Sequence, residues 1–202
     1  MRPDELGVSR ETSERLDLYV RHLLKWNAAI NLVGRPITSS QVWTRHVADC
    51  VQLAPWLPQA SRWTDLGSGG GLPGIVVAIL AKEHGLPREV TCIESDGRKA
   101  EFLRSVQRAI DLPIQIICNR IEAAPPQGAD IVSARALAPL PRLLGLVSRH
   151  LAQNGTALLM KGAGWREEVE VARKEWHLLI EAVPSRTNTD AVILEIGELR
   201  RR

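Results

Sequence analysis

Residues 64–75 read TDLGSGGGLPGI and constrain the fold of this 202-residue chain more than any other stretch. Five glycines within eight residues cost much conformational entropy on folding, which a simple surface turn does not require. A strand-like pattern precedes these glycines, and Pro73 fits the first position of a helix after them. The sequence predicts a strand–loop–helix unit whose glycine loop (residues 67–74) approaches a ligand closely.

From residue 61 onward, strand-like and helix-like segments alternate. Strands are expected at residues 61–66, 89–95, 113–118, 129–134, 155–162, 177–184 and 190–198. Helices are expected at residues 73–85, 96–112, 140–152 and 166–176. This alternation predicts a mainly parallel α/β sheet with helices on both faces, closed by an antiparallel last strand. Ligands bind such sheets at the carboxyl ends of the strands, where the glycine loop lies.

The N-terminal region has a different, helical pattern. Apolar side chains with helical spacing predict a helix at residues 9–26, which Ser9 can cap. A second helix is expected at residues 38–56, where Thr38 and Gln41 fit a capping box. We therefore expect a helical extension over residues 1–57, packed on a compact domain formed by residues 58–202.

Composition narrows the class of protein. No apolar run approaches the roughly 18 residues of a membrane span. The polar N-terminus differs from a secretory signal. We therefore expect a cytoplasmic protein with no membrane partner. The net charge of +3 permits a polyanionic partner without requiring one. Cys50, Cys92 and Cys118 have no CxxC spacing, which favours buried reduced thiols over a metal or redox site.

Several ligands compete for the glycine loop. A triphosphate loop needs Lys and then Ser or Thr after its last glycine, whereas an isoleucine and a valine follow Gly74. Gly69, Gly71 and Gly74 fit the dinucleotide pattern GxGxxG, but this frame starts two residues after the strand and includes a proline where pyrophosphate needs a helix N–H. A purely structural turn is disfavoured by the number of glycines.

Another frame starts from Asp65, at the end of the first strand, followed by the alternating glycines Gly67, Gly69 and Gly71. It resembles the first motif of Rossmann-like methyltransferases that use S-adenosylmethionine (AdoMet). AdoMet carries an ammonium group, a carboxylate and a sulfonium but no phosphate. Asp65 can attract the ammonium group, and glycines let the backbone approach the methionine part.

Residues at the ends of the next two strands fit a nucleoside. Glu94 ends the second strand, where a carboxylate can accept two hydrogen bonds from a ribose diol. Ile121 and Glu122 follow the third strand. Isoleucine can pack against adenine, and Glu122 or its backbone can read the base edge, although Glu122 taken alone is better explained as a solvated loop acid. A ribose-binding acid does not separate AdoMet from NAD.

Seven motifs then occur in order along the chain: KWNAAINLVG, RHVADC, DLGSGGGLPGI, CIESDGRKAEFL, NRIEA, ARALAPL and LMKG. Together they resemble the ribosomal RNA small subunit methyltransferase G family, also called glucose-inhibited division protein B, over residues 16–196. The resemblance implies a class I AdoMet-dependent fold that methylates N7 of one guanine, guanine 527 in the 530 loop of 16S rRNA, within the small ribosomal subunit or its precursor. We expect a monomer that uses AdoMet and no metal.

The resemblance also assigns residues. It implies cofactor contacts at Gly67, Leu72, Ile121, Glu122 and Arg135. Its N-terminal signature covers Asn31, His46 and Asp49. Two positions depart from the family: Ala134 stands where a serine is common, and Asp190 stands near a frequent basic residue. We therefore expect one RNA contact to be missing or supplied by Arg186.

Guanine N7 is unprotonated at neutral pH, so no residue is assigned as a general acid or base. Catalysis then depends on orientation and electrostatics. We expect Arg135 to orient AdoMet and Lys161 to contact phosphate or guanine O6. His46 and Asp49 lie three residues apart on one helical face and can hydrogen-bond each other, as a packing pair or as part of an RNA-contacting surface with Asn31.

The sequence leaves undecided which tryptophans stack on bases, and it leaves two alternative functions. Trp165 is the best candidate for stacking on a base, whereas Trp26, Trp43 and Trp56 fit amphipathic helices. An NAD-linked oxidoreductase typically needs a Tyr-x-x-x-Lys pair, which the single tyrosine, Tyr19, does not form. A non-catalytic RNA-binding module on the same fold is the other alternative.

Overall fold

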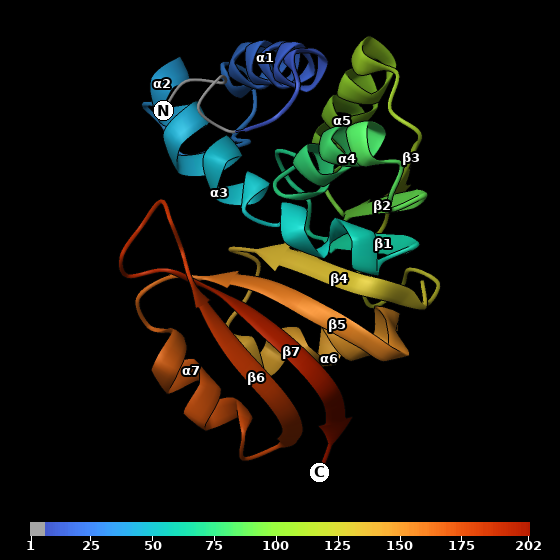
Figure 1. The fold of residues 1–202 in the computed structure, drawn as a ribbon, viewed down its shortest axis with the longest axis vertical. Helices are drawn as coiled ribbons and strands as arrows, with labels where there is room; N and C mark the ends of the chain where they lie inside the picture. Colours follow the sequence, from blue (N-terminus) through green and yellow to red (C-terminus); the bar gives the residue numbers. More distant parts are fainter. Residues whose placement is uncertain (1–6) are drawn as a thin grey trace.

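A seven-stranded sheet runs through the molecule, which the computed structural model describes for residues 7–202 (Figure 1). Its strands are β1 (Arg62–Leu66), β2 (Glu89–Glu94), β3 (Ile114–Cys118), β4 (Ala129–Arg135), β5 (Leu151–Lys161), β6 (Trp176–Pro184) and β7 (Val192–Arg201). They lie in the order β3-β2-β1-β4-β5-β7-β6. β1 to β5 are parallel, whereas β7 is antiparallel to both neighbours. The predicted sheet, mainly parallel with an antiparallel last strand, is confirmed.

Helices cover both faces of the sheet, as the alternation predicts (Figure 1). One face carries α4 (Gly74–His84) and α5 (Gly97–Ile110), and the other carries α6 (Leu140–His150) and α7 (Trp165–Ala172). α4 is apolar on all sides because it lies between the sheet and the N-terminal helices. Gly85, with a φ of 72°, ends α4 in the left-handed conformation that favours glycine.

The N-terminal segment contains α1 (Arg10–Asn27), α2 (Ser39–Val42), the π-helical turn η2 (Trp43–Val47), α3 (Ala48–Val51) and the 3₁₀ turn η3 (Ala54–Gln59). Ser9 caps α1, and Thr38 with Gln41 forms the capping box, so both caps are confirmed. The single helix expected at residues 38–56 is wrong, since a π-helical turn interrupts it and a 3₁₀ turn ends it. Pro55 has no N–H to continue an α-helical ladder.

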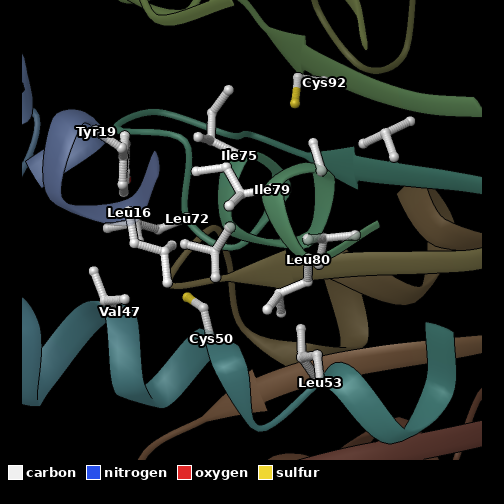
Figure 2. Packing of buried hydrophobic residues seen from close by; sticks show 14 of the residues in the cluster. Leu16, Tyr19, Val47, Cys50, Leu53, Leu72, Ile75, Ile79, Leu80 and Cys92 are labelled. Carbon is white, nitrogen blue, oxygen red and sulfur yellow. The ribbon is translucent and has the colours of Figure 1, made fainter. Parts of the chain in front are cut away.

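One apolar cluster joins the N-terminal helices to the rest of the chain. Figure 2 shows Leu16 and Tyr19 of α1 close to Leu72 and Ile75 of the glycine-loop region, with Cys50 of α3 below them. The Tyr19 hydroxyl also donates a hydrogen bond of 2.6 Å to the carbonyl oxygen of Gly70. α1 therefore packs directly on the glycine loop. The division of the chain at residue 57 stays a prediction.

Candidate functional site

The glycine loop adopts a backbone that only glycine accommodates easily. Gly67, Gly69 and Gly71 have φ values of 67°, 53° and 83°. A side chain at Gly67 would collide with Leu137, and one at Gly71 would collide with Ile75. All three positions therefore favour glycine because of the left-handed backbone, and Gly67 and Gly71 also because of close packing.

Behind the loop, the fully buried Asp65 holds the start of α4. Its carboxylate accepts a hydrogen bond of 3.1 Å from the Gly74 N–H and one of 2.8 Å from the Ser133 hydroxyl. The Ser133 oxygen in turn accepts from the Trp63 indole N–H at 2.9 Å. Burial raises the pKa of Asp65 to about 6, against the lowering effect of these hydrogen bonds.

In front of the loop lies a cavity of about 350 Å³, which we call the loop cavity. The Glu94 carboxylate lines it and accepts hydrogen bonds of 2.8 Å from the N–H groups of Gly69 and Asp96. A Cβ atom built at Gly69 would stand 4.0 Å from Glu94 Oε2. The absence of that Cβ leaves a space in front of an ordered carboxylate, which fits the ribose and methionine parts of AdoMet.

The far wall of the loop cavity contains Ile121 and Glu122. Two residues at the end of α6 hold the backbone of this wall. His150 Nε2 lies 3.0 Å from the Ile121 carbonyl oxygen, and the Arg149 guanidinium donates to the Ala124 carbonyl oxygen at 3.0 Å. His150 is fully buried, and burial lowers its pKa, so the ring is neutral and Nε2 carries the proton that it donates. The sequence analysis missed both supports because no local pattern marks them.

A second cavity, of about 750 Å³, shares the lining residue Ala136 with the first and is called the polar cavity. Ala136 lines both cavities and has a φ of 50°, which is unusual for a residue other than glycine. The polar cavity is lined by Arg45, His46, Asp49, Arg135, Ala136, Met160, Lys161, Gly162, Ala163, Gly164, Glu168, Thr187, Asn188 and Ala191. Two cavities that share one small residue can bring two bound molecules into contact.

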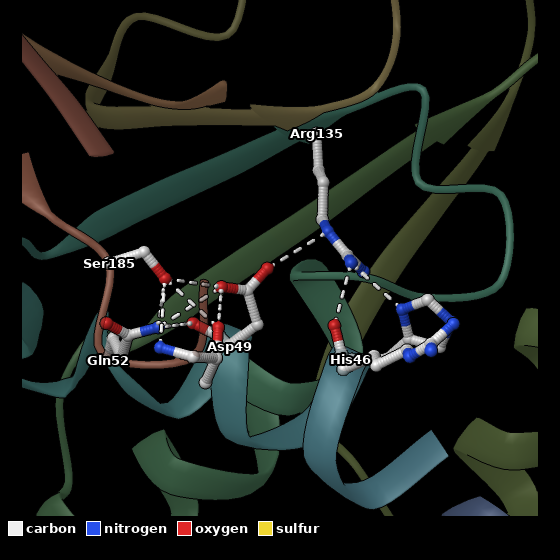
Figure 3. Close-up of polar contacts among 7 residues, drawn as sticks. His46, Asp49, Gln52, Arg135 and Ser185 are labelled. Atoms are coloured by element: carbon white, nitrogen blue, oxygen red, sulfur yellow. Dashed lines mark hydrogen bonds and ion pairs between the residues drawn. The ribbon is translucent and has the colours of Figure 1, made fainter. Parts of the chain in front are cut away.

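Arg135 connects β4 to the N-terminal helices on the wall of the polar cavity (Figure 3). Its Nε lies 3.3 Å from Asp49 Oδ2, and its Nη2 lies 2.9 Å from His46 Nδ1 and 3.0 Å from the Arg45 carbonyl oxygen. Burial and the Arg135 charge lower the pKa of His46 to about 4, so the ring is neutral and Nδ1 accepts. The expected pairing of His46 with Asp49 is replaced by contacts of both residues to Arg135.

Asp49 also holds the turn between β6 and β7. Its Oδ1 accepts hydrogen bonds from Thr187 Oγ1 at 2.8 Å, Ser185 Oγ at 3.3 Å and Gln52 Nε2 at 3.1 Å. Figure 3 shows Ser185 of this turn and Gln52, which follows the last residue of α3, both pointing toward Asp49. The carboxylate therefore links three distant segments of the chain.

Lys161 lies at the end of β5 and forms an ion pair of 2.6 Å with Glu168 of α7. Its ammonium group also donates to the Ala138 carbonyl oxygen at 3.0 Å. Glu168 Oε2 additionally accepts from the Leu140 N–H at 2.5 Å. The pair thus holds the segment that follows Ala136, at the junction of the two cavities.

Comparison with known proteins places the chain in a family. A family model described as rRNA small subunit methyltransferase G matches residues 12–192. Two relatives with the name Ribosomal RNA small subunit methyltransferase G are each 48% identical to it. The one from Ruegeria sp. (strain TM1040) aligns over 98% of this chain and 96% of its own, and the one from Paramagnetospirillum magneticum over 100% and 98%. The chain belongs to the ribosomal RNA small subunit methyltransferase G family.

Solved structures support the fold of this methyltransferase G family member. A cofactor-bound Mycobacterium tuberculosis protein, Rv0187, superposes with a TM-score of 0.62 at 14% identity, covering 91% of both chains. An O-methyltransferase from Bacillus cereus in complex with SAH superposes with a TM-score of 0.59 at 13% identity, covering 90% of this chain and 91% of its own. At such low identities the likeness concerns the Rossmann-like class I fold alone.

The predicted site residues lie on the loop cavity, on the polar cavity or behind the glycine loop. Those on the loop cavity are Gly67, Gly69, Glu94, Ile121 and Glu122. Those on the polar cavity are His46, Arg135 and Lys161. Asp65 and Leu72 are buried behind the loop, so Asp65 acts there through Gly74 rather than from the cavity surface. The cofactor and substrate roles of all these residues stay predictions.

Asn31, expected near the substrate, is exposed and lies outside the linings of both cavities. The nearby Asn27 is buried instead, and its side-chain oxygen accepts from the N–H groups of Leu32 and Val33 at 2.9 and 3.1 Å. Asn27 therefore shapes the loop that carries Asn31, and its place as the last residue of α1 is the signal that could have found it.

Two expected absences concern metals and membranes. Within residues 7–202, no three His, Cys, Asp or Glu side chains come together as a metal site. In the same part of the chain, no helix has the length and apolar character that a membrane crossing requires.

The three cysteines form no disulfide bond. Cys50 and Cys92 are buried, whereas Cys118 is exposed, so the expectation of buried thiols is wrong for Cys118.

Proposed function

We propose that this protein transfers a methyl group from AdoMet to N7 of a guanine in 16S rRNA, namely guanine 527 in the 530 loop. The observation that carries the proposal is the junction at Ala136, where a cavity suited to a nucleoside cofactor meets a larger polar cavity. Membership of the methyltransferase G family supports the same activity. The protein would act as a monomer in the cytoplasm, on the small ribosomal subunit or its precursor.

The loop cavity has the groups that AdoMet needs. AdoMet, when bound, supplies an electrophilic methyl group. Glu94 would accept hydrogen bonds from the ribose hydroxyls, since its carboxylate is already oriented by two backbone N–H groups. Ile121 would pack against adenine, and Glu122 or its backbone would read the base edge. Asp65 would support this site from behind by holding the first residue of α4.

The polar cavity would hold the acceptor base. Guanine N7 already offers a lone pair at neutral pH, so these residues need to orient the base rather than remove a proton. His46 is neutral, because its pKa is lowered to about 4, and its Nδ1 is occupied by Arg135. It is therefore suited to positioning and not to acid–base chemistry. Arg135 fixes the wall between the base and the N-terminal helices.

Labelled AdoMet with small subunits that lack this modification tests the proposal. We expect one methyl group per particle, located at N7 of guanine 527 when the nucleotide is mapped. Naked 16S rRNA in parallel identifies the form of the substrate. Methylation at another nucleotide would contradict the assigned target.

Two competing functions are tested by two assays: calorimetry with AdoMet and NADH for the first, and transfer of the methyl label into small subunits for the second. An NAD-linked oxidoreductase would bind NADH and not AdoMet. A non-catalytic RNA-binding module would bind AdoMet and RNA without transferring the label. Either result would overturn the proposed activity.

A further inference from the structure

Apart from the exposed Arg45, the charged side chains that line the polar cavity form two pairs, which differ in how many hydrogen-bonding groups they leave unused. In the first pair, both Asp49 oxygens and the Arg135 guanidinium have protein partners. In the second, Lys161 forms an ion pair with Glu168 and donates one hydrogen bond, to the Ala138 carbonyl oxygen, so its three N–H groups are not all used. Glu168 accepts both of its contacts through Oε2, and among the described residues no partner is recorded for Oε1. The second pair therefore offers one donor and one acceptor side by side.

This donor–acceptor pair matches one edge of guanine. Guanine presents the O6 acceptor directly beside the N1–H donor. Adenine presents the reverse, an amino donor at C6 beside an unprotonated N1, although it has the same N7. We propose that Lys161 and Glu168 select guanine as the acceptor base, with the Lys161 ammonium donating to O6 and Glu168 Oε1 accepting from N1–H. This inference rests on the proposed function.

Lys161 and Glu168 are held rigidly enough to discriminate guanine from other bases. The Lys161 and Glu168 side chains are only 11% and 30% exposed. The Ala138 carbonyl fixes the ammonium group, and the Leu140 N–H fixes Oε2. A partly dehydrated, preorganised pair makes a mismatched base costly, because its donors or acceptors remain unpaired in the cavity.

The location of the pair fits an acceptor site. Arg135 aligns with Met160 in the register of β4 and β5, so Lys161 follows at the same carboxyl edge of the sheet. Both Lys161 and Glu168 line the polar cavity, which shares the lining residue Ala136 with the loop cavity. The pair therefore faces the space next to the methyl donor site without lining that site.

Glu168→Gln gives a sharp test because the two ends of the amide are not equivalent. Lys161 and the Leu140 N–H both require an acceptor, so the amide oxygen takes the place of Oε2. The NH₂ group then takes the place of Oε1, and a donor faces the base where an acceptor stood. Glu167→Gln is the matched control, since Glu167 lies on the same turn of α7, is exposed and lines neither cavity.

The assay uses reconstituted small subunits with guanine, inosine or 2-aminopurine at the methylated position, under single-turnover conditions. Inosine keeps O6 and N1–H, whereas 2-aminopurine lacks O6 and has an unprotonated N1; all three bases have N7. We expect Glu168→Gln to lower the rates on guanine and inosine roughly 10- to 100-fold. The rate on 2-aminopurine should rise relative to guanine by at least about tenfold, while Glu167→Gln behaves as wild type.

Calorimetry with AdoMet separates base selection from a damaged fold, and we expect AdoMet affinity within about twofold of wild type. Three results would overturn the inference: unchanged rates on guanine and inosine, an equal loss on all three bases, or a loss of AdoMet affinity that accounts for the slower rates. If the wild-type protein fails to methylate guanine at all, the proposed function fails instead.

Discussion

Asp65→Asn should change how the stability of this protein depends on pH. Asp65 is fully buried, and its two oxygens accept hydrogen bonds from Gly74 and Ser133. Burial raises its pKa from 3.8 to about 6, more than these hydrogen bonds lower it. The native state therefore binds a proton at Asp65 more tightly than the unfolded chain does.

The size of the effect follows from this shift in pKa. A change from 3.8 to about 6 corresponds to about 3 kcal/mol, at roughly 1.4 kcal/mol for each pKa unit. A raised pKa gives stability that is fully present below pH 3.8 and is lost as the pH rises through 6, because the ionised carboxylate must stay buried. Asparagine does not titrate. The free energy of unfolding of the wild type minus that of the variant should therefore fall by about 3 kcal/mol in all as the pH rises from below 3.8 to well above 6.

Urea unfolding, followed by tryptophan fluorescence from pH 3.5 to 7.5, measures this difference. Groups that titrate equally in both proteins cancel from the subtraction. Asp190→Asn, at an exposed turn residue, controls for the substitution itself. A difference that stays flat or rises with pH would refute the reasoning, because the hydrogen bonds from Gly74 and Ser133 would then outweigh burial.

Three further substitutions test the site. Glu94→Gln places an amide donor against the N–H of Gly69 or Asp96. This substitution should weaken AdoMet binding roughly 10-fold or more in calorimetry. An unchanged dissociation constant would contradict the ribose-binding role. Gly71→Ala places a side chain on a backbone with a φ of 83° and should lower the free energy of unfolding in urea by about 1–3 kcal/mol. An unshifted urea midpoint would argue against this strain. Asp49→Asn removes the charge that pairs with Arg135 and should slow single-turnover methylation about tenfold or more. Full activity would exclude a positioning role for Asp49.

The sheet and the glycine loop could be predicted because their signals are local. Left-handed glycines, capping side chains and alternating apolar segments each act within a few residues. Boundaries were less certain: Leu151 and Ala152 were expected to end α6 but begin β5. A short apolar run at a junction fits either helix or strand, and pairing with β4 decides the outcome.

The polar contacts of the site could not be predicted in the same way. The sequence analysis assigned the charged groups of Arg135 and Lys161 to ligands, and it paired His46 with Asp49. In the structure, Arg135 contacts His46, and Lys161 contacts Glu168. Arg135 and His46 are separated by 89 residues along the chain and are brought together only by the tertiary fold, which no local pattern reveals.

These internal contacts are what a methyl transfer without proton transfer requires. A lone pair on the acceptor removes the need for a base, so the remaining contribution of the protein is the relative position of donor and acceptor. A displacement of about 1 Å can cost roughly 100-fold in rate. Asp49 joins Arg135 to the turn between β6 and β7, and Lys161 with Glu168 holds the segment after Ala136. Both clusters line the polar cavity, so under the proposed function their polar groups would set the distance between donor and acceptor rather than supply a reacting atom.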